Sequence, residues 1–268
     1  MGDVFNAIAL GILEGVTEFL PVSSTGHLIL AGHLLEFEGR AADTFKIVIQ
    51  LGAVLALLLL YWKRYMTILR GLVAFGGLRK QEQLNAIHLF LAMFPGLVVY
   101  LIAKDAIKTV LFGPGPVLIG LVAGGVLMIA ASRAKRTITA ERTDDIGYKQ
   151  AFGIGLFQCL SLWPGFSRSG STIAGGLLLG TSQKAAADFT FIVSVPVMLG
   201  ATLLDLFDNR LWLTTDDFAL FAVGFAAAFL VAMIAVTTFL KLIKRLRLEW
   251  FALYRFALAA IFYWVVFV

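Results

Sequence analysis

The most informative segment of the chain runs from Glu14 to His27 and reads EGVTEFLPVSSTGH. It places two carboxylates, a proline, two serines, a threonine and a histidine between the apolar runs GIL and LILAGHLL. The whole chain is 60% hydrophobic and only 15% charged, whereas soluble domains are about 45–50% apolar and about 25% charged. We therefore expect the bilayer to be the solvent, and the polar segment to serve a function inside it.

The apolar runs predict helices. In lipid, every backbone polar group must bond within the protein, which allows only helices or a closed barrel. Runs such as Val54–Leu60 and Val223–Ala235 do not alternate polar with apolar residues, which argues against barrel strands. We predict an all-α polytopic membrane protein, a single membrane domain over residues 1–268. Membrane-crossing helices of roughly 20 residues are expected at about 44–62, 84–103, 115–132, 186–206, 217–240 and 250–268.

Loop charges predict the direction of these helices, because cytoplasmic loops are rich in Lys and Arg. The acidic loop carries Asp205, Asp208, Asp216 and Asp217 and is expected outside. The net charge of +5 is confined to short loops, so it does not indicate nucleic-acid binding. Three basic loops are expected in the cytoplasm, and they contain Lys63, Arg64, Arg70, Arg79, Lys80; Arg133, Lys135, Arg136, Arg142, Lys149; and Lys241, Lys244, Arg245, Arg247.

Two further apolar segments, 4–35 and 151–180, are interrupted by LPVSSTGH and WPGFSRSGS. Segment 151–180 follows a cytoplasmic loop and precedes a helix that must run outward, so we predict that it enters and leaves on the cytoplasmic side. Segment 4–35 is predicted to be re-entrant from the outside, the alternative being one kinked crossing. The fold expected is thus six crossing helices plus two re-entrant helix–loop–helix segments.

The two broken segments are related to each other. GILE at Gly11 matches GLFQ at Gly155, 144 residues later, and Ala-Ala-Asp ending at Asp43 matches the same triplet ending at Asp188. The repeat halves are about 1–140 and 141–268. With opposite orientations, they predict an inverted-topology repeat whose broken helices form a site near the midplane.

Four ionisable residues in these segments suggest a shared site, because a charge at bilayer depth costs about 2.5–3.5 kcal/mol on insertion scales. They are Glu14, Glu18, His27 and Arg168. Glu14 and Glu18 lie four residues apart on one helix face. Two close carboxylates need a divalent cation, an arginine or a shared proton between them. Glu14 and Glu18 are therefore candidate ligands of Mg²⁺ or Ca²⁺, which prefer oxygen.

Serines at the helix starts predict an anion site. Ser23 or Ser24 and Ser167 are natural N-caps, and a helix N-terminus favours phosphate. Arg168 adds a planar fork of donors. Ser24 is a candidate nucleophile. The other candidate phosphate-binding residues are Thr25, Gly26, Ser169, Gly170 and Gln158. Several of these predictions have an alternative, since Ser23, Thr25 and Ser169 can simply pack between helices. Gln50 and Gln158 can line the pocket or form hydrogen bonds between helices, and His88 is expected to be a packing residue.

EGVTEFLPVSSTGH closely resembles the first signature of the undecaprenyl-pyrophosphate phosphatases of the bacitracin-resistance type, and PGFSRSGSTIAGG resembles the second. TFKIVIQLGAVLAL and ALYRF are also similar, so the likeness covers nearly the whole chain. It implies an enzyme of the bacterial cytoplasmic membrane that removes the terminal phosphate of C55 isoprenyl pyrophosphate and returns the carrier to cell-wall synthesis. It also implies a site open to the periplasmic or outer face, a divalent cation (Mg²⁺ or Ca²⁺) and a homodimer.

Carried over by residue, the resemblance assigns catalytic roles to Glu14, Glu18, Ser24, His27 and Arg168, and a polar surround to Ser23, Thr25, Ser167, Ser169 and Thr172. Our hypothesis is that Ser24 attacks the terminal phosphorus and that His27, oriented or assisted by Glu18, handles its proton. Attack by metal-bound water with Glu18 as base is the second possibility. The competing class is a transporter or flippase that uses the same anion site for a lipid phosphate.

Overall fold

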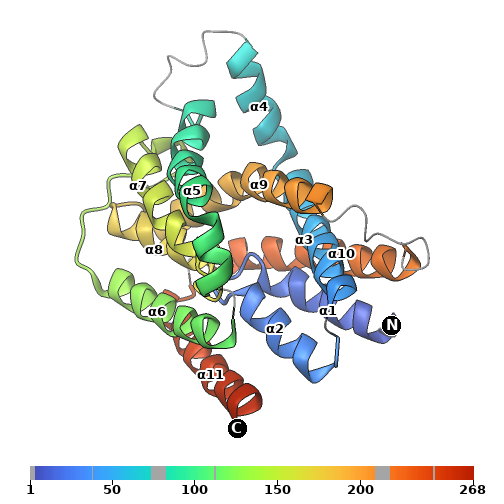
Figure 1. Cartoon of the computed structure of the whole chain (residues 1–268). Coiled ribbons are helices and arrows are strands. Elements are labelled where there is room, and N and C mark those ends of the chain that lie inside the picture. Colours follow the sequence, from blue (N-terminus) through green and yellow to red (C-terminus); the bar gives the residue numbers. More distant parts are fainter. Residues whose placement is uncertain (1–3, 38, 74–82, 112, 209–217, 244) are drawn as a thin grey trace.

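The computed structural model describes residues 4–37, 39–73, 83–111, 113–208, 218–243 and 245–268. Within them the regular secondary structure is helical, apart from one isolated bridge between Ala140 and Thr181 (Figure 1). Short turns of other helix types lie at Ile107–Leu111, Thr143–Asp145 and Cys159–Leu162. The α-helices are α1 Val4–Thr17, α2 Ser24–Leu34, α3 Arg40–Leu60, α4 Trp62–Val73, α5 Ala86–Ala106, α6 Pro114–Arg133, α7 Tyr148–Gln158, α8 Arg168–Leu178, α9 Gln183–Asp208, α10 Phe218–Leu242 and α11 Leu248–Phe267.

Six helices in the described part of the chain are long and apolar enough to cross a membrane. They are α3, α5, α6, α9, α10 and α11, and each overlaps one predicted crossing, so a multi-pass membrane protein is confirmed. Local capping sets the ends: α5 starts at Ala86 because the side chain of Asn85 accepts from Ile87 N at 3.0 Å. Of the predicted loop charges, Arg79, Lys80, Asp216, Asp217 and Lys244 lie outside the described residues.

The two interrupted segments have the same local form. α1 ends before Pro21 and α7 ends before Pro164, and the chain then turns into α2 and α8, each of 11 residues. The residue before each of these helices is a serine with φ of 71°, Ser23 in one and Ser167 in the other. This left-handed conformation is uncommon outside glycine. The sharp turn it makes brings a new helix N-terminus to the end of each broken segment.

Small residues let the broken segments pack closely against their neighbours. A Cβ added to Gly11 would lie 2.4 Å from Gly224 O of α10, and one added to Gly155 would lie 2.5 Å from Ala92 O of α5. Helix α1 accordingly packs on α10, and α7 packs on α5. Close backbone approach through glycine is the usual means of helix association in membranes.

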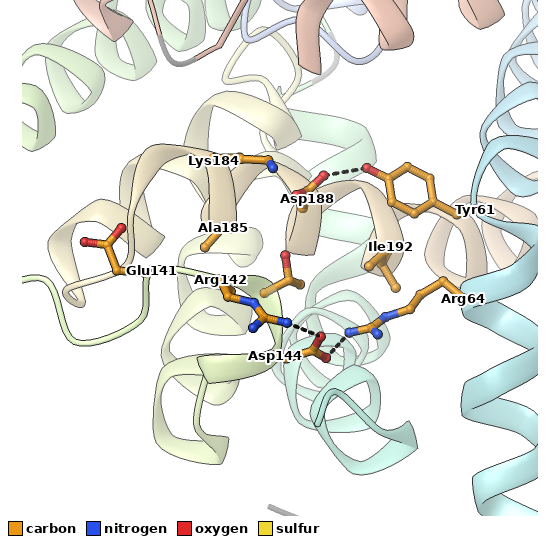
Figure 2. A pocket seen from close by; sticks show the side chains of 10 residues that line it. Tyr61, Arg64, Glu141, Arg142, Asp144, Lys184, Ala185, Asp188 and Ile192 are labelled. Atoms are coloured by element: carbon orange, nitrogen blue, oxygen red, sulfur yellow. Dashed lines mark hydrogen bonds and ion pairs between the residues drawn. The ribbon is translucent and has the colours of Figure 1, made fainter. Parts of the chain in front are cut away.

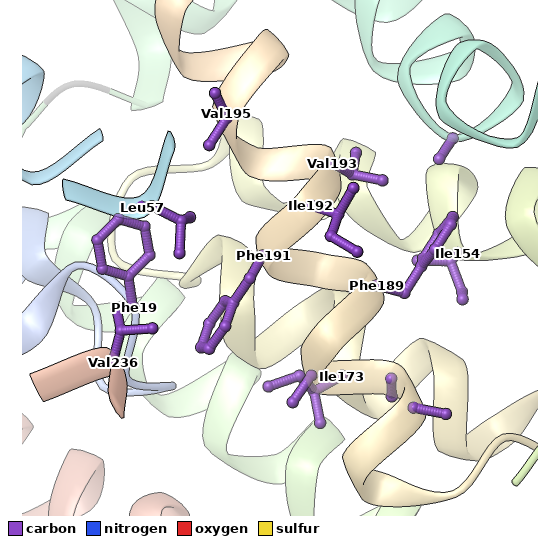
Figure 3. Close-up of a cluster of buried hydrophobic side chains, with 14 of the residues drawn as sticks. Phe19, Leu57, Ile154, Ile173, Phe189, Phe191, Ile192, Val193, Val195 and Val236 are labelled. Carbon is purple, nitrogen blue, oxygen red and sulfur yellow. The ribbon is translucent and has the colours of Figure 1, made fainter. Parts of the chain in front are cut away.

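The largest cluster of buried hydrophobic side chains lies around α9 (Figure 3). Phe19, which follows α1, is 1% exposed and meets Phe191 of α9 edge to face at a ring distance of 5.7 Å. Edge-to-face aromatic pairs are worth about 0.5–1.5 kcal/mol beyond their buried area. Because Phe19 is anchored in this cluster, the neighbouring Glu18 is fixed at the edge of the core.

Candidate active site

The turns after α1 and before α8 touch each other. The hydroxyl of Ser169 donates to Leu20 O at 2.9 Å and lies 3.2 Å from the hydroxyl of Ser167. The bond from Ser169 to Leu20 joins residues about half the chain apart, so it holds the two turns together. Ser169 is buried and does not line the cavity described below.

Glu18 links the two turns electrostatically. Its Oε1 accepts from Nη2 of Arg168 at 2.6 Å, and its Oε2 accepts from the hydroxyl of Ser24 at 2.5 Å. The Glu18 side chain is 7% exposed and that of Arg168 is 13% exposed. A charge-assisted bond from a hydroxyl to a carboxylate is short and strong, so Ser24, Glu18 and Arg168 form one connected unit.

Helix α9 offers backbone acceptors to two side chains near the site, Tyr65 and Arg168. Pro196 has no N–H, so it leaves the carbonyl of Ile192 without its helical donor. The hydroxyl of Tyr65 donates to that carbonyl at 2.8 Å. Nη1 of Arg168 lies 3.4 Å from Ser194 O in the same stretch. Helix α9 thus supplies a backbone acceptor to the guanidinium of Arg168, which also donates to Glu18.

A cavity of about 230 Å³ lies between the two turns and α9. Ser23 accepts from Gly26 N at 3.4 Å and Ser167 accepts from Gly170 N at 3.1 Å, so each serine caps its helix. Both helix N-termini therefore border one space, which suits an anion. The residues that line it are Glu18, Ser23, Ser24, Thr25, Gln50, Ser161, Trp163, Pro164, Gly165, Ser167, Arg168, Val197, Met198 and Ala201.

Glu14 lies one helical turn before Glu18 and is 1% exposed. Its Oε2 is buried and has no hydrogen-bond partner within the described part of the protein. An orphaned carboxylate oxygen beside a second carboxylate fits a hard cation, which takes oxygen ligands. The described residues contain no group of three or more His, Cys, Asp or Glu side chains. Glu14 and Glu18 fit a cation whose other ligands come from elsewhere, such as phosphate oxygens and water.

His27 does not contact Ser24 as our hypothesis required. Its Nδ1 lies 2.7 Å from Ser23 O, which can only accept, so Nδ1 carries the proton. Its Nε2 lies 2.7 Å from the hydroxyl of Tyr254 and is therefore the acceptor when the ring is neutral. With both ring nitrogens engaged, His27 is not placed to take the proton of Ser24; the structure places Glu18 there.

Four other predicted residues lie behind the cavity wall, not in it. Gln158 donates to Ala92 O of α5 at 3.4 Å, so it bonds between helices. Thr172 donates to Arg168 O at 2.8 Å and accepts from Thr190 at 2.9 Å. Gly26 and Gly170 are buried in the first turns of α2 and α8. None of these four residues is among those that line the cavity.

Sequence reasoning missed several residues of the site. Ser161 and Trp163 line the cavity, and Trp163 Nε1 donates to Pro116 O at 2.8 Å. Tyr254 holds His27. The only signal for Tyr254 was its place in the segment ALYRF, whose similarity had no assigned role. His88 packs as expected, beside Tyr148 at a ring distance of 4.3 Å.

A second hollow, of about 320 Å³, lies at the other end of α9 (Figure 2). Tyr61 donates to Asp188 at 2.8 Å, and Asp144 pairs with Arg64 and Arg142. Burial alone would raise the pKa of Asp144, but hydrogen bonds from Arg64 and the backbone outweigh it and lower the pKa. Both arginines of this hollow are paired with Asp144, and its lining contains neither of the capping serines that border the cavity at Arg168.

Comparison with known proteins places these features in a family. The family described as bacitracin resistance protein BacA matches residues 7–261. The chain is 54% identical over 264 residues to "Undecaprenyl-diphosphatase 1" of Bacillus anthracis, and 53% identical over 264 residues to the protein of the same name from Bacillus thuringiensis subsp. konkukian (strain 97-27). Each match covers 98% of both chains. A family match over nearly the whole chain, including both turns of the cavity, shows that this protein belongs to the bacitracin resistance protein BacA family.

Proposed function

We propose that this protein is an undecaprenyl-diphosphatase, which hydrolyses undecaprenyl pyrophosphate to undecaprenyl phosphate and phosphate. The observation that carries the proposal is the unit of Ser24, Glu18 and Arg168 beside two helix N-termini. It combines a nucleophile, a base and a phosphate-binding cation inside a membrane protein. The relatives that match 98% of the chain bear this enzyme's name. Recycling of the carrier lipid for peptidoglycan and other cell-wall polymers follows from the activity.

The chemistry begins at Ser24. Its Oγ attacks the terminal phosphorus while its proton passes to Oε2 of Glu18, the acceptor at 2.5 Å. An Oγ–P bond forms, and the bond from phosphorus to the bridging oxygen breaks, so undecaprenyl phosphate leaves. Water then attacks phosphorylated Ser24 and releases phosphate. Direct attack by water, with Glu18 as base, is the alternative; trapping a phosphorylated Ser24 separates the two.

Arg168 and the helix N-termini stabilise the charge of the transferring phosphoryl group. A guanidinium and preorganised N–H groups act strongly where water is excluded. Arg168 is positioned for this by Glu18 on one side and Ser194 O on the other. We further propose that Glu14 and Glu18 hold a divalent cation, Mg²⁺ or Ca²⁺. When bound, it would neutralise pyrophosphate charge.

We also propose that α1–α2 and α7–α8 are re-entrant, and that residues 1–140 and 141–268 form an inverted repeat. Three features support this. Ser23 and Ser167 share the same φ and the same capping bond. Helices α2 and α8 have equal length. The packing of α1 on α10 and of α2 on α11 has a counterpart in α7 on α5 and α8 on α6.

The site is proposed to open to the periplasmic face of the bacterial cytoplasmic membrane. The basic loops assign the start of α9, near Lys184, to the cytoplasm. The cavity is lined by Val197, Met198 and Ala201, further along α9 toward the opposite side. Access of labelling reagents to a cysteine at Thr25 would test this. A homodimer, expected from the family resemblance, is part of the same proposal and is tested by crosslinking in membranes.

The decisive experiment is phosphate release from a C55 or C15 isoprenyl pyrophosphate by purified protein in detergent. Release that needs Mg²⁺ or Ca²⁺ and falls sharply in Glu18→Ala, Ser24→Ala and Arg168→Ala is expected. Glu141→Gln, an exposed carboxylate away from the cavity, is the control. A folded protein that releases no phosphate would contradict the proposal and would direct attention to transport of a lipid phosphate in liposomes.

A further inference from the structure

Arg255 lies inside α11 and is completely buried, with 0% exposure. Its hydrogen-bond partners within the described residues are backbone carbonyls and the sulfur of Met128, with no carboxylate among them. An unpaired charge inside a membrane protein is expensive and marks a functional position by default. The mechanism proposed above does not use it.

The guanidinium joins α6 to the turn that precedes Arg168. Nη1 donates to Phe166 O at 2.8 Å, and Nη2 donates to Gly165 O at 2.8 Å. On the side of α6, Nη2 also reaches Gly120 O at 3.0 Å, and Nε reaches Leu121 O at 3.1 Å. An arginine has five N–H donors in a rigid fork, and here nearly all of them serve to bridge two pieces of backbone.

Glycines bring the turn and the fork into contact with α6. A Cβ added to Gly120 would lie 2.5 Å from Pro164 O. One added to Gly124 would lie 2.3 Å from Nη2 of Arg255 and 2.5 Å from Phe166 O. The guanidinium and the turn therefore lie in close contact with the backbone of α6.

The two carbonyls of the turn that Arg255 binds lie directly before the residues of the proposed active site. Phe166 precedes Ser167, which caps α8, and Ser167 precedes Arg168, which bonds Glu18. The residue before Arg255 reaches the other turn: Tyr254 bonds His27 at 2.7 Å, and their rings stack at 5.6 Å. Two consecutive residues of α11, Tyr254 and Arg255, thus contact the two turns that form the site.

We propose that Arg255 is a positioning residue. By holding the carbonyls of Gly165 and Phe166 against α6, it sets where the N-terminus of α8 and the guanidinium of Arg168 meet the substrate's phosphates. The inference rests on the proposed phosphatase function and adds a residue that never touches the substrate. Lysine at this position retains the charge but offers three donors from one point in place of a planar fork, so it cannot bridge all four carbonyls.

The test compares two independent ways of weakening the hydrogen bonds between Arg255 and the turn. Arg255→Lys replaces the planar guanidinium, and Gly124→Ala displaces the guanidinium by adding a methyl group beside it. Each has a control: Arg247→Lys lies at the exposed start of the same helix, and Gly115→Ala lies in the same helix as Gly124 but places its Cβ where no atom lies within 4 Å. Phosphate release, the thermal midpoint and the fraction folded are measured for all four variants and for the unmodified protein.

We expect kcat to fall about 10- to 100-fold per folded molecule in Arg255→Lys and Gly124→Ala, since a displacement of about 1 Å costs on that order. KM should change less than kcat, and both controls should keep kcat within about twofold. A lowered thermal midpoint with unchanged kcat per folded molecule would overturn the inference and leave Arg255 a structural residue. If Arg255→Lys does not fold, Gly124→Ala decides.

The proposed function can fail separately. If the unmodified protein releases no phosphate, the phosphatase reading is wrong, and the same variants are compared for binding of inorganic pyrophosphate by calorimetry. Affinity weakened in Arg255→Lys and Gly124→Ala, but not in the controls, would support a positioned anion site. Equal affinity in all of them would overturn the role of Arg255 as well.

Discussion

Replacing Glu18 with glutamine should remove most turnover while keeping the shape of the site. The carboxylate accepts one bond from Ser24 and one from Arg168; the amide keeps one acceptor and cannot take a proton. Loss of a general base costs about 10²- to 10⁴-fold in kcat, or about 2.7–5.4 kcal/mol of barrier at 1.36 kcal/mol per tenfold. The weakened bond to buried Arg168 adds a loss of stability of about 1–3 kcal/mol.

The matched comparison is His27→Asn, assayed by phosphate release and corrected for the folded fraction. Because both ring nitrogens of His27 are bonded away from Ser24, we expect kcat to fall less than tenfold. Glu141→Gln controls for the lost charge. The reasoning is refuted if His27→Asn loses as much activity as Glu18→Gln, or if Glu18→Gln stays within tenfold of the unmodified protein.

Three more outcomes are expected. Gly165→Ala should lower the thermal midpoint and the activity, because its φ is +90° and the new Cβ would lie 2.2 Å from a carbonyl oxygen of α6, whereas Gly147→Ala, with no atom closer than 4.0 Å, should not. Asp144→Asn should lower the thermal midpoint at pH 7; since the folded pKa of Asp144 is depressed, the stabilisation is present above the unfolded pKa of about 3.9 and the difference should shrink as pH falls below it. Chelation with EDTA should stop phosphate release, and added Mg²⁺ or Ca²⁺ should restore it.

Hydropathy was sufficient to predict the crossing helices, because lipid demands about 20 apolar residues in each. It was not sufficient to predict which helices are neighbours. A helix face toward lipid and a face toward protein are equally apolar, so pattern alone does not separate them. The packing of α1 on α10 depends on Gly11 and Gly15, whose added Cβ atoms would lie 2.4 and 2.7 Å from α10 carbonyls. Such contacts are visible in the sequence only as isolated glycines.

The site was predictable where polar residues interrupt apolar sequence, as at Glu18, Ser24 and Arg168. Their pairing was not. Ser24 follows Pro21, and the turn there brings its hydroxyl back to Glu18. His27 begins the next helical turn after Ser23, so its Nδ1 meets the carbonyl four residues back. Arg255 is visible in the sequence only as a charge inside the apolar segment 250–268. Its role could not be predicted, because its partners are mostly backbone carbonyls, which every residue has.

The capping serines explain how the cavity combines different chemistries. Ser23 and Ser167 both adopt φ of 71°, a conformation that costs of order 1–3 kcal/mol outside glycine. Glycine would relieve that strain but lose the side-chain oxygen that caps α2 or α8, so serine meets both needs. The first residue after one cap is Ser24, and the first after the other is Arg168. Two equivalent backbone turns thus present the nucleophile and the phosphate-binding cation from opposing helix ends into one cavity, and Glu18 bonds both.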